Sequence, residues 1–271
     1  MTNFQYFCHT YICIFNLFTM KILAIIPSRY SSTRFPGKPL AVVKGIPMVV
    51  RVYQRAKEVF EDVCVATDDE RIFKTVQNYG GVAVMTSTTH QSGTDRCLEG
   101  LKKYSAMKGE TFDVVVNVQG DEPFISPKQL KQLSDCFEDT KVEIATLVKR
   151  GESATDVLDP NRPKVVINKE NFALYFSRSE IPYNRASSLT DEIVQNGNYL
   201  LHIGLYGYRT EVLEKICSLE QSYLEKTESL EQLRWIENGL KIKVALSSET
   251  SYGIDTPEDL DKINAMADDT F

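Results

Sequence analysis

The most constraining feature of the chain is the alternation of short apolar runs with amphipathic stretches in its first half. Runs typical of strands cover residues 22–26, 63–66, 82–85 and 114–118, and stretches with helical periodicity cover residues 48–60, 70–79, 95–104 and 127–137. Parallel strands need crossovers of a dozen or more residues, which are usually helices. The alternation therefore predicts a doubly wound, mostly parallel α/β sheet with helices on both faces.

The pattern is looser beyond about residue 140, where long polar loops separate the candidate elements. We expect further strands over residues 144–148, 164–167, 173–176, 199–208 and 241–246, and helices over residues 223–236 and 257–267. Residues 20–271 are interpreted as one domain, with a smaller lobe inserted at about residues 150–210.

Residues 1–19 form an apolar and aromatic segment ahead of the first expected strand. Gln5, His9 and Asn16 interrupt it before it reaches the roughly 20 apolar residues of a membrane span. It also has neither the basic start nor the small-residue cleavage site of a secretory signal. We expect Met20 to be the biological start and no stable membrane insertion, with an interfacial anchor as the alternative.

Composition and charge narrow the classes of function. The 271-residue chain carries 31 Lys and Arg against 37 Asp and Glu, a net charge of −6, so no general positive field would draw it to nucleic acid. Its six cysteines lack the C-x-x-C spacing of zinc and redox sites, which favours a reducing cytoplasm. An anionic ligand would therefore have to meet a local cluster of cations.

The loop after the first expected strand holds such a cluster. Residues 27–40 include Arg29, Arg34 and Lys38, four Ser and Thr hydroxyls, and no acid. Ligands of open α/β sheets bind beyond the carboxyl ends of the strands, where this loop must lie, and both cation types suit phosphate oxygens. The loop matches neither the Rossmann nor the P-loop glycine pattern. It indicates a polyphosphate site of another kind, the alternative being a solvated basic loop.

Two acidic positions also follow expected strands. Asp121 and Glu122 come directly after residues 114–118, and Asp255 precedes the last expected helix, which Thr256 can cap. Hard oxygen ligands beside a triphosphate suit Mg²⁺, which takes only one or two carboxylates. Ordinary turn chemistry remains the alternative for Asp121, and helix entry the alternative for Asp255. Glu122 is expected to be structural.

A series of ordered motifs resembles those of the 3-deoxy-manno-octulosonate (Kdo) cytidylyltransferases, over about residues 20–267. The first motif is IIPSRYSSTRFPGKPL at residues 25–40. The others are HQSGTDR, NVQGDEP, YFSR, HIGLYGYR, LEQLR and DTPEDL, at residues 90–96, 117–123, 175–178, 202–209, 230–234 and 255–260. The resemblance implies a fold like that of the nucleotide-diphospho-sugar transferases. It also implies transfer of a cytidylyl group from CTP to Kdo, which yields CMP-Kdo and pyrophosphate.

The resemblance implies roles for individual residues of these motifs. The residues that would bind CTP are Arg29, Ser32, Arg34, Lys38, Ser92, Gly93, Arg96 and Gln119. Those that would act in catalysis are Arg29, Arg34, Lys38, Asp121 and Asp255, the last two as Mg²⁺ ligands. The acid sugar would meet Arg178, His202, Tyr206, Glu231 and Gln232. From the residues alone, Ser92 suits a helix cap, His202 a core position, and Glu231 and Gln232 a solvated helix face.

The match shows a few mild departures. Ser28, Phe35, Asp95 and Tyr183 stand where the family pattern suggests Ala, Leu, Glu and Trp, and a shorter Asp95 could alter how the base-binding helix is held. Two alternatives stay open: activation of another acid sugar, such as sialic acid or 8-amino-Kdo, and nucleotide binding without turnover. The resemblance also implies a homodimer that acts in lipopolysaccharide biosynthesis in a Gram-negative cytoplasm.

Overall fold

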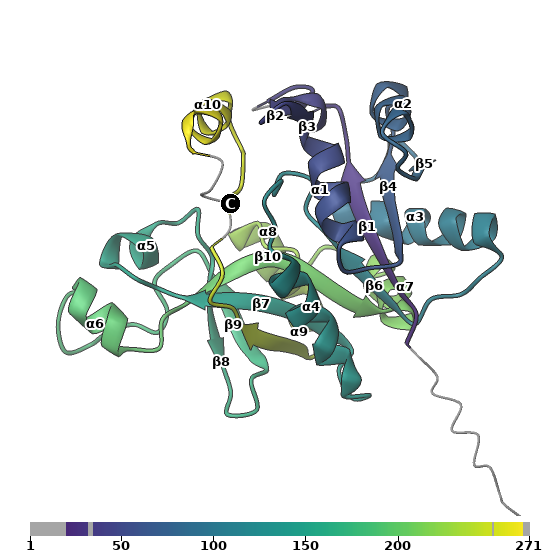
Figure 1. The fold of residues 1–271 in the computed structure, drawn as a ribbon. Helices are drawn as coiled ribbons and strands as arrows, with labels where there is room; N and C mark the ends of the chain where they lie inside the picture. The colour runs from purple at the N-terminus through teal and green to yellow at the C-terminus, as the bar shows by residue number, and fades with distance from the viewer. Residues whose placement is uncertain (1–19, 32–34, 251, 268–271) are drawn as a thin grey trace, which may run out of the picture.

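A mixed sheet of nine strands forms the centre of the protein, in a computed structural model that describes residues 20–31, 35–250 and 252–267 (Figure 1). Seven of the strands form one continuous path across the sheet. Their order is β11 (Ile242–Leu246), β7 (Ile144–Arg150), β10 (Leu200–Arg209), β6 (Val114–Asn117), β1 (Ile22–Ser28), β4 (Asp62–Thr67) and β5 (Ala83–Met85).

The strand directions confirm the predicted mostly parallel sheet. β1 pairs in parallel with β4 and β6, β4 with β5, and β7 with β11. β10 runs antiparallel between β6 and β7, so that it alone opposes the other strands of the path. The loops that follow β1, β5, β6 and β11 consequently leave the sheet at the same edge.

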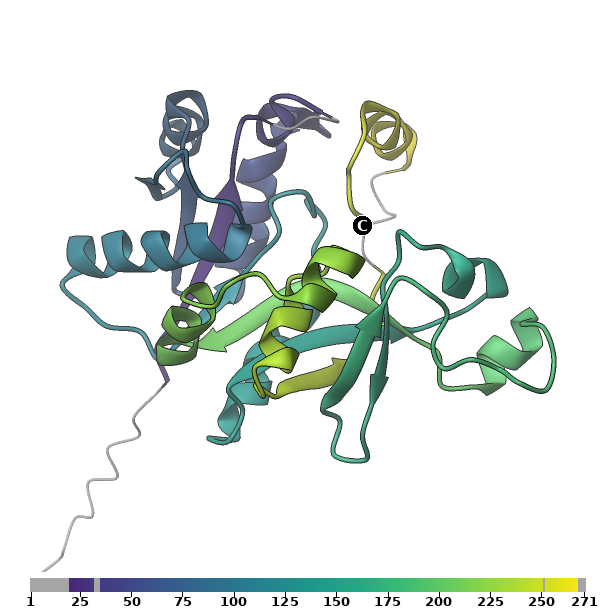
Figure 2. The same ribbon diagram turned by 180° about the vertical axis from the view of Figure 1, so that it is seen from behind.

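Helices cover both faces of the sheet, as the alternation predicts (Figures 1 and 2). One face packs against α1 (Met48–Lys57), α2 (Glu70–Asn78) and α4 (Pro127–Asp135). The other packs against α3 (Gly93–Lys108), α7 (Thr210–Cys217) and α9 (Gln232–Glu237). Neighbouring residues of β1 alternate between the two cores, since Ile25 belongs to one and Ile26 to the other, and both are fully buried.

A smaller group of elements branches from β10. β8 (Lys164–Ile167) pairs antiparallel with β10 and with β9 (Ala173–Ser177). Next to these strands, α5 (Ala154–Leu158) and α6 (Asp191–Asn196) share a small core of Val157, Val194 and Tyr199. The extent of a separate lobe at about residues 150–210 stays a prediction, and residues 1–19 lie outside the described part of the chain.

The helical stretch expected over residues 223–236 is in fact two helices. α8 (Tyr223–Glu228) ends at Ser229, which adopts the left-handed conformation with φ 51° and ψ 47°, and α9 starts three residues later. A non-glycine residue in this region interrupts a helix, although the apolar periodicity of the sequence continues across it. α10 (Pro257–Ala265) begins at the expected Pro257.

Several short elements were not expected from the sequence: α5, α6, α7, the hairpin of β2 (Val42–Val43) and β3 (Ile46–Pro47), and the 3-10 turn η1 (Lys38–Leu40). The helix expected over residues 127–137 ends as α4 at Asp135 and continues as the 3-10 turn η2 (Cys136–Glu138). Within the described residues, no helix combines the length and the apolar character needed to cross a membrane. The four cysteines described there are free thiols.

Candidate active site

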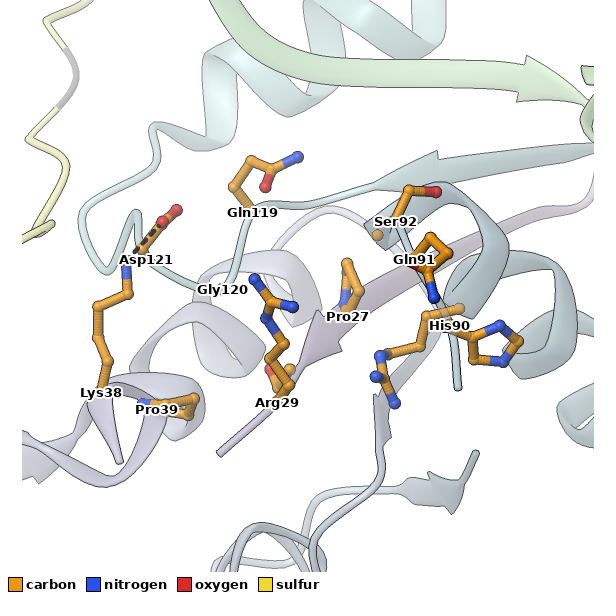
Figure 3. A pocket seen from close by; sticks show the side chains of 13 residues that line it. Pro27, Arg29, Lys38, Pro39, His90, Gln91, Ser92, Gln119, Gly120 and Asp121 are labelled. Atoms are coloured by element: carbon orange, nitrogen blue, oxygen red, sulfur yellow. Dashed lines mark hydrogen bonds and ion pairs between the residues drawn. The ribbon is translucent and has the colours of Figure 1, made fainter. Parts of the chain in front are cut away.

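A cavity of about 270 Å³ opens at the carboxyl edge of the sheet. The loops after β1, β5 and β6 supply its walls, and many of the side chains are polar or charged (Figure 3). The lining residues are Pro27, Ser28, Arg29, Lys38, Pro39, His90, Gln91, Ser92, Gly93, Arg96, Gln119, Gly120 and Asp121. The structure therefore brings seven predicted site residues into one cavity: Arg29, Lys38, Ser92, Gly93, Arg96, Gln119 and Asp121.

The cavity floor depends on a close approach between the ends of β1 and β6. A Cβ atom on Gly120 would lie 3.1 Å from Ser28 Oγ and 3.2 Å from the carbonyl oxygen of Pro27. These distances are tight, so a side chain at position 120 would push the two loops apart. Glycine at this position therefore keeps Gln119 and Asp121 next to the loop after β1.

Lys38 joins the basic loop to both predicted metal carboxylates. Its Nζ atom lies 2.8 Å from Asp121 Oδ2 and 3.2 Å from Asp255 Oδ1, although the three residues are far apart in the sequence. Gly37, with φ 73°, directs the chain into η1, the turn that begins with Lys38. The side chain of Lys38 is only 14% exposed, and those of Asp121 and Asp255 are 34% and 52% exposed. One cation thus lies between two carboxylates at the cavity mouth.

Arg29 supplies a second cation to the cavity. Its side chain is exposed, and its guanidinium group stands between Lys38 and Ser92 in Figure 3. A planar guanidinium at this place can bind phosphate oxygens with two donors at once. Ser32 and Arg34, the other cavity residues expected from the basic loop, lie outside the described residues.

The start of α3 forms the wall opposite Lys38. Ser92 is the N-cap: its Oγ accepts a hydrogen bond from the Asp95 N–H at 3.1 Å, and Asp95 Oδ2 accepts one from the Ser92 N–H at 3.3 Å. The shorter acid at position 95 therefore still closes a capping box. Gly93 carries no side chain, so the first turn of α3 presents its backbone to the cavity.

Arg96 lines the cavity, but its guanidinium group is already engaged. It donates hydrogen bonds to Thr86 Oγ1 at 2.6 Å, Asp68 Oδ2 at 2.8 Å and the Ser87 carbonyl oxygen at 3.3 Å. The side chains of Arg96 and Asp68 are only 4% and 11% exposed. The ion pair between Arg96 and Asp68 holds the cavity wall in place. The sequence motif at residues 90–96 did not indicate this tertiary contact.

His202 and Tyr206, two expected sugar ligands, lie in an aromatic cluster with Phe176. The ring centroid of His202 is 5.2 Å from that of Phe176 and 5.3 Å from that of Tyr206. His202 Nε2 lies 3.1 Å from Thr146 Oγ1. Burial lowers the pKa of His202 to about 3, so the imidazole is neutral at neutral pH. It therefore supplies no positive charge for an acid sugar.

Arg178, another expected sugar ligand, directly follows β9, as expected for a residue at a strand end. Its guanidinium group donates hydrogen bonds to backbone carbonyl oxygens of Glu228 at 2.6 Å, Pro160 at 2.9 Å and Ser229 at 3.3 Å. These bonds hold the left-handed turn between α8 and α9 against the end of β9. Arg178, His202, Tyr206 and Gln232 do not line the cavity described above, nor do they line a second cavity that adjoins it.

Glu231 lies in a second cavity, of about 540 Å³, that adjoins the first. Gln91 and Ser92 line both cavities, so Glu231 faces space that continues from the start of α3. Sequence reasoning missed Thr94, although the motif at residues 90–96 contains it. Thr94 Oγ1 donates a hydrogen bond to Glu231 Oε2 at 2.8 Å and so joins the first turn of α3 to Glu231.

His90 is a second missed residue of the first cavity. Its Nε2 atom contacts Oε2 of Glu99, a residue of α3. Burial raises the pKa of Glu99, but hydrogen bonds from Lys103, the Ser87 N–H and His90 outweigh it and hold the pKa at about 2. The ionised Glu99 thus holds in place the loop that carries His90 into the cavity. The sequence did not indicate this role of Glu99, because charged residues on a helix are usually exposed to solvent.

Comparison with known proteins decides the family. A family model for cytidylyltransferases matches residues 23–242. The chain belongs to the cytidylyltransferase family. The match spans the basic loop, Asp121 and Glu231, so family membership covers most of the residues that surround the two cavities.

Several relatives of the chain carry the same name. A 3-deoxy-manno-octulosonate cytidylyltransferase of Parabacteroides distasonis is 55% identical over 91% of this chain and 98% of the relative. Its counterpart in Bacteroides thetaiotaomicron is 54% identical over 89% of this chain and 96% of the relative. A solved CMP:2-keto-3-deoxy-manno-octonic acid synthetase in complex with CTP is 41% identical, covers 90% of this chain and 97% of its own, and has a TM-score of 0.81. The resemblance drawn from the motifs is therefore confirmed.

Proposed function

We propose that the protein transfers a cytidylyl group from CTP to Kdo, with release of pyrophosphate. The observation that carries this proposal is the contact of Lys38 with both Asp121 and Asp255 beside the cavity that Arg29 lines. The names of the relatives that share about half of the sequence support CTP and Kdo as the substrates. The complex of the similar synthetase with CTP supports the nucleotide in particular.

The residues of the cavity suit a nucleoside triphosphate. Arg29 and Lys38 place two positive charges at one side, and the start of the 16-residue helix α3 faces them from the other. A helix N-terminus and two cations together favour an anionic ligand between them. Gln119, next to Gly120, offers an amide that can donate and accept hydrogen bonds to the nucleotide.

The donor set also fits Mg²⁺. The carboxylates of Asp121 and Asp255 already flank one cation, the ammonium group of Lys38. The described residues contain no cluster of three or more His, Cys, Asp or Glu side chains that could hold a metal, so protein ligands at this site would be limited to the two carboxylates. Two carboxylates with phosphate oxygens and water are the ligands that Mg²⁺ prefers. Asp121 and Asp255 would hold the ion, which would supply charge neutralisation at the phosphates and acidify the attacking hydroxyl.

The proposed reaction is an in-line displacement at phosphorus. The anomeric 2-hydroxyl oxygen of Kdo forms a bond to the α-phosphorus of CTP, and the bond from that phosphorus to the oxygen bridging the α- and β-phosphates breaks. Pyrophosphate leaves with the bridging oxygen, and the hydroxyl proton passes to solvent. Such a transfer depends on positioning and charge stabilisation. Arg29 and Lys38 would therefore hold the triphosphate and then stabilise the negative charge of the departing pyrophosphate.

The acceptor would bind in the second cavity, next to Glu231. A polyhydroxy acid needs hydrogen-bond acceptors for its hydroxyl groups and donors for its carboxylate. Glu231 provides an acceptor there, and Lys226 and Gln221 line the same cavity as possible donors. Arg178, His202, Tyr206 and Gln232 stay candidates for the sugar. Arg178 and His202 are half-buried, whereas Tyr206 and Gln232 are buried and would have to become accessible when the substrate binds.

The metal role is tested by Asp121→Asn and Asp255→Asn in an assay of Mg²⁺-dependent pyrophosphate release from CTP and Kdo. Each variant should lose at least about 100-fold in rate with an unchanged thermal unfolding midpoint. Asp261→Asn, an exposed acid on the nearby α10, is the matched control and should retain the wild-type rate. Substantial activity in both site variants would contradict the proposed ligand set. Sialic acid and 8-amino-Kdo in the same assay test the acceptor.

The cellular setting follows from the family resemblance. We propose a homodimer in the cytoplasm that supplies an activated acid sugar for lipopolysaccharide biosynthesis. Sedimentation equilibrium of the purified chain tests the dimer, for which the expected mass is about twice the monomer mass of 30.7 kDa. A monomeric mass at micromolar concentration would contradict it.

A further inference from the structure

The carboxylate of Glu231 is held by both of its oxygens. Thr94 Oγ1 donates to Oε2 at 2.8 Å, and Arg234 Nη2 donates to Oε1 at 2.9 Å. Both donors are buried, since Thr94 is 2% exposed and the Arg234 side chain 9% exposed, whereas the Glu231 side chain is 27% exposed. The carboxylate is thus fixed from behind while part of it remains accessible from the second cavity.

Arg234 is itself fixed by further contacts. Its Nε atom lies 3.2 Å from Glu225 Oε2, in an ion pair whose side chains are 9% and 8% exposed, and its Nη1 donates to the Leu219 carbonyl oxygen at 2.8 Å. Glu225 in turn closes the capping box of α8 with Ser222. The guanidinium group therefore has little freedom to rotate, and the hydrogen bond to Glu231 has a defined direction.

The buried charges in this cluster do not balance. Arg234 carries one positive charge, and Glu225 and Glu231 carry two negative charges when ionised. Each carboxylate oxygen of Glu231 has two lone-pair directions, and the donors named above use one at each oxygen. The Ser92 side chain is a further hydrogen-bond donor to this carboxylate. Because Glu231 lines the second cavity, hydroxyl groups of a ligand there would satisfy the acceptor capacity that remains.

We propose that Thr94 and Arg234 are positioning residues that orient Glu231 to accept hydrogen bonds from the hydroxyl groups of the acceptor sugar. The inference rests on the proposed function and deepens it. Thr94 is the second residue of α3, directly after Gly93 of the nucleotide cavity. The Thr94 hydroxyl therefore also fixes the distance between the nucleotide wall and the acceptor carboxylate.

The matched pair Thr94→Val and Thr94→Ser tests this inference. Valine keeps the shape of the side chain and removes the donor, and serine keeps the hydroxyl. We expect Thr94→Val to lower kcat/KM for Kdo about tenfold, which corresponds to about 1.4 kcal/mol of lost transition-state stabilisation, through a raised KM for Kdo. The KM for CTP should stay within about twofold of wild type, and Thr94→Ser should restore kcat/KM for Kdo to within about threefold.

Three outcomes would overturn the inference. They are an unchanged kcat/KM for Kdo in Thr94→Val, equal losses of kcat/KM for CTP and for Kdo, and equal losses in the valine and serine variants. Arg234→Lys keeps the positive charge but removes the planar guanidinium group, so it should also raise the KM for Kdo and leave the KM for CTP unchanged. A lower unfolding midpoint with an unchanged KM for Kdo would contradict the positioning role of Arg234. If the wild-type chain turns over Kdo and Thr94→Val has the same kcat/KM for Kdo, the result would contradict this inference but not the proposed function. An inactive wild-type chain would instead contradict the proposed function.

Discussion

Lys38 Nζ lies 2.8 Å from Asp121 Oδ2, although 83 positions separate the two residues in the sequence. The contact joins the loop after β1 to the loop after β6, two neighbouring parallel strands, and the same nitrogen reaches Asp255 beyond β11. A buried or half-buried cation between two carboxylates offsets their mutual repulsion. The ammonium group of Lys38 also occupies the place where a divalent ion would contact both carboxylates.

Lys38→Met should strengthen metal binding in the absence of nucleotide while it weakens turnover. Without the ammonium group, Asp121 and Asp255 lose the cation that competes with a metal, so Mn²⁺ should bind at least about tenfold more tightly to the nucleotide-free variant. Titration followed by electron paramagnetic resonance measures this. Lys74→Met, which removes an exposed lysine of α2, is the control. Weaker or equal Mn²⁺ binding in Lys38→Met would contradict the arrangement.

Arg96→Met should act on stability first. It leaves Asp68 buried without its partner, and breaking a buried ion pair in this way costs about 3–5 kcal/mol. Urea denaturation of the nucleotide-free protein measures the loss. The double variant Asp68→Asn with Arg96→Met removes the unpaired charge and should recover part of the stability. Wild-type stability combined with a large loss of CTP affinity would show instead that Arg96 serves the ligand directly.

Gly120→Ala should disturb the cavity floor. The added methyl group would meet Ser28 Oγ and the Pro27 carbonyl oxygen, and overpacking of this kind costs about 1–3 kcal/mol. We expect a lower unfolding midpoint and weaker CTP binding by isothermal titration calorimetry. Gly253→Ala is the control near the same edge, because its Cβ would have no neighbour within 4 Å. Equal behaviour of the two variants would contradict the close approach.

His202 should make stability depend on pH in a defined window. Burial lowers its pKa from 6.5 to about 3, so the unfolded chain binds the proton more tightly than the folded one. The stabilising contribution is therefore complete above pH 6.5 and is lost as the pH falls toward 3. The stability difference between wild type and His202→Gln, from urea denaturation at several pH values, should shrink over this range. A constant difference would contradict a buried neutral imidazole.

Local signals made the central sheet and the basic loop predictable. Strand and helix periods are properties of short segments, and the carboxyl ends of parallel strands share an edge. Lys38, Asp121 and Arg29 could thus be assigned to one edge of the sheet. The break at Ser229 could not, because the apolar pattern of a helix continues through it and only the left-handed backbone interrupts it.

The partners of the charged site residues required the tertiary structure. Arg96 bonds to Asp68, 28 positions away, and Arg178 bonds to carbonyl oxygens about 50 positions away. No periodicity encodes such contacts, so the sequence alone presents both arginines as available to substrates. Thr94 was hidden for the same reason, since its partner Glu231 lies 137 positions further along the chain.

The most direct test of the account is phosphorus NMR of the wild-type protein with CTP, Kdo and Mg²⁺. The account predicts that CTP signals give way to those of pyrophosphate and a CMP diester, and that omission of Kdo or of Mg²⁺ abolishes both products. CTP that stays intact with all three components present, or that yields pyrophosphate and free CMP without incorporation of the sugar, would contradict it.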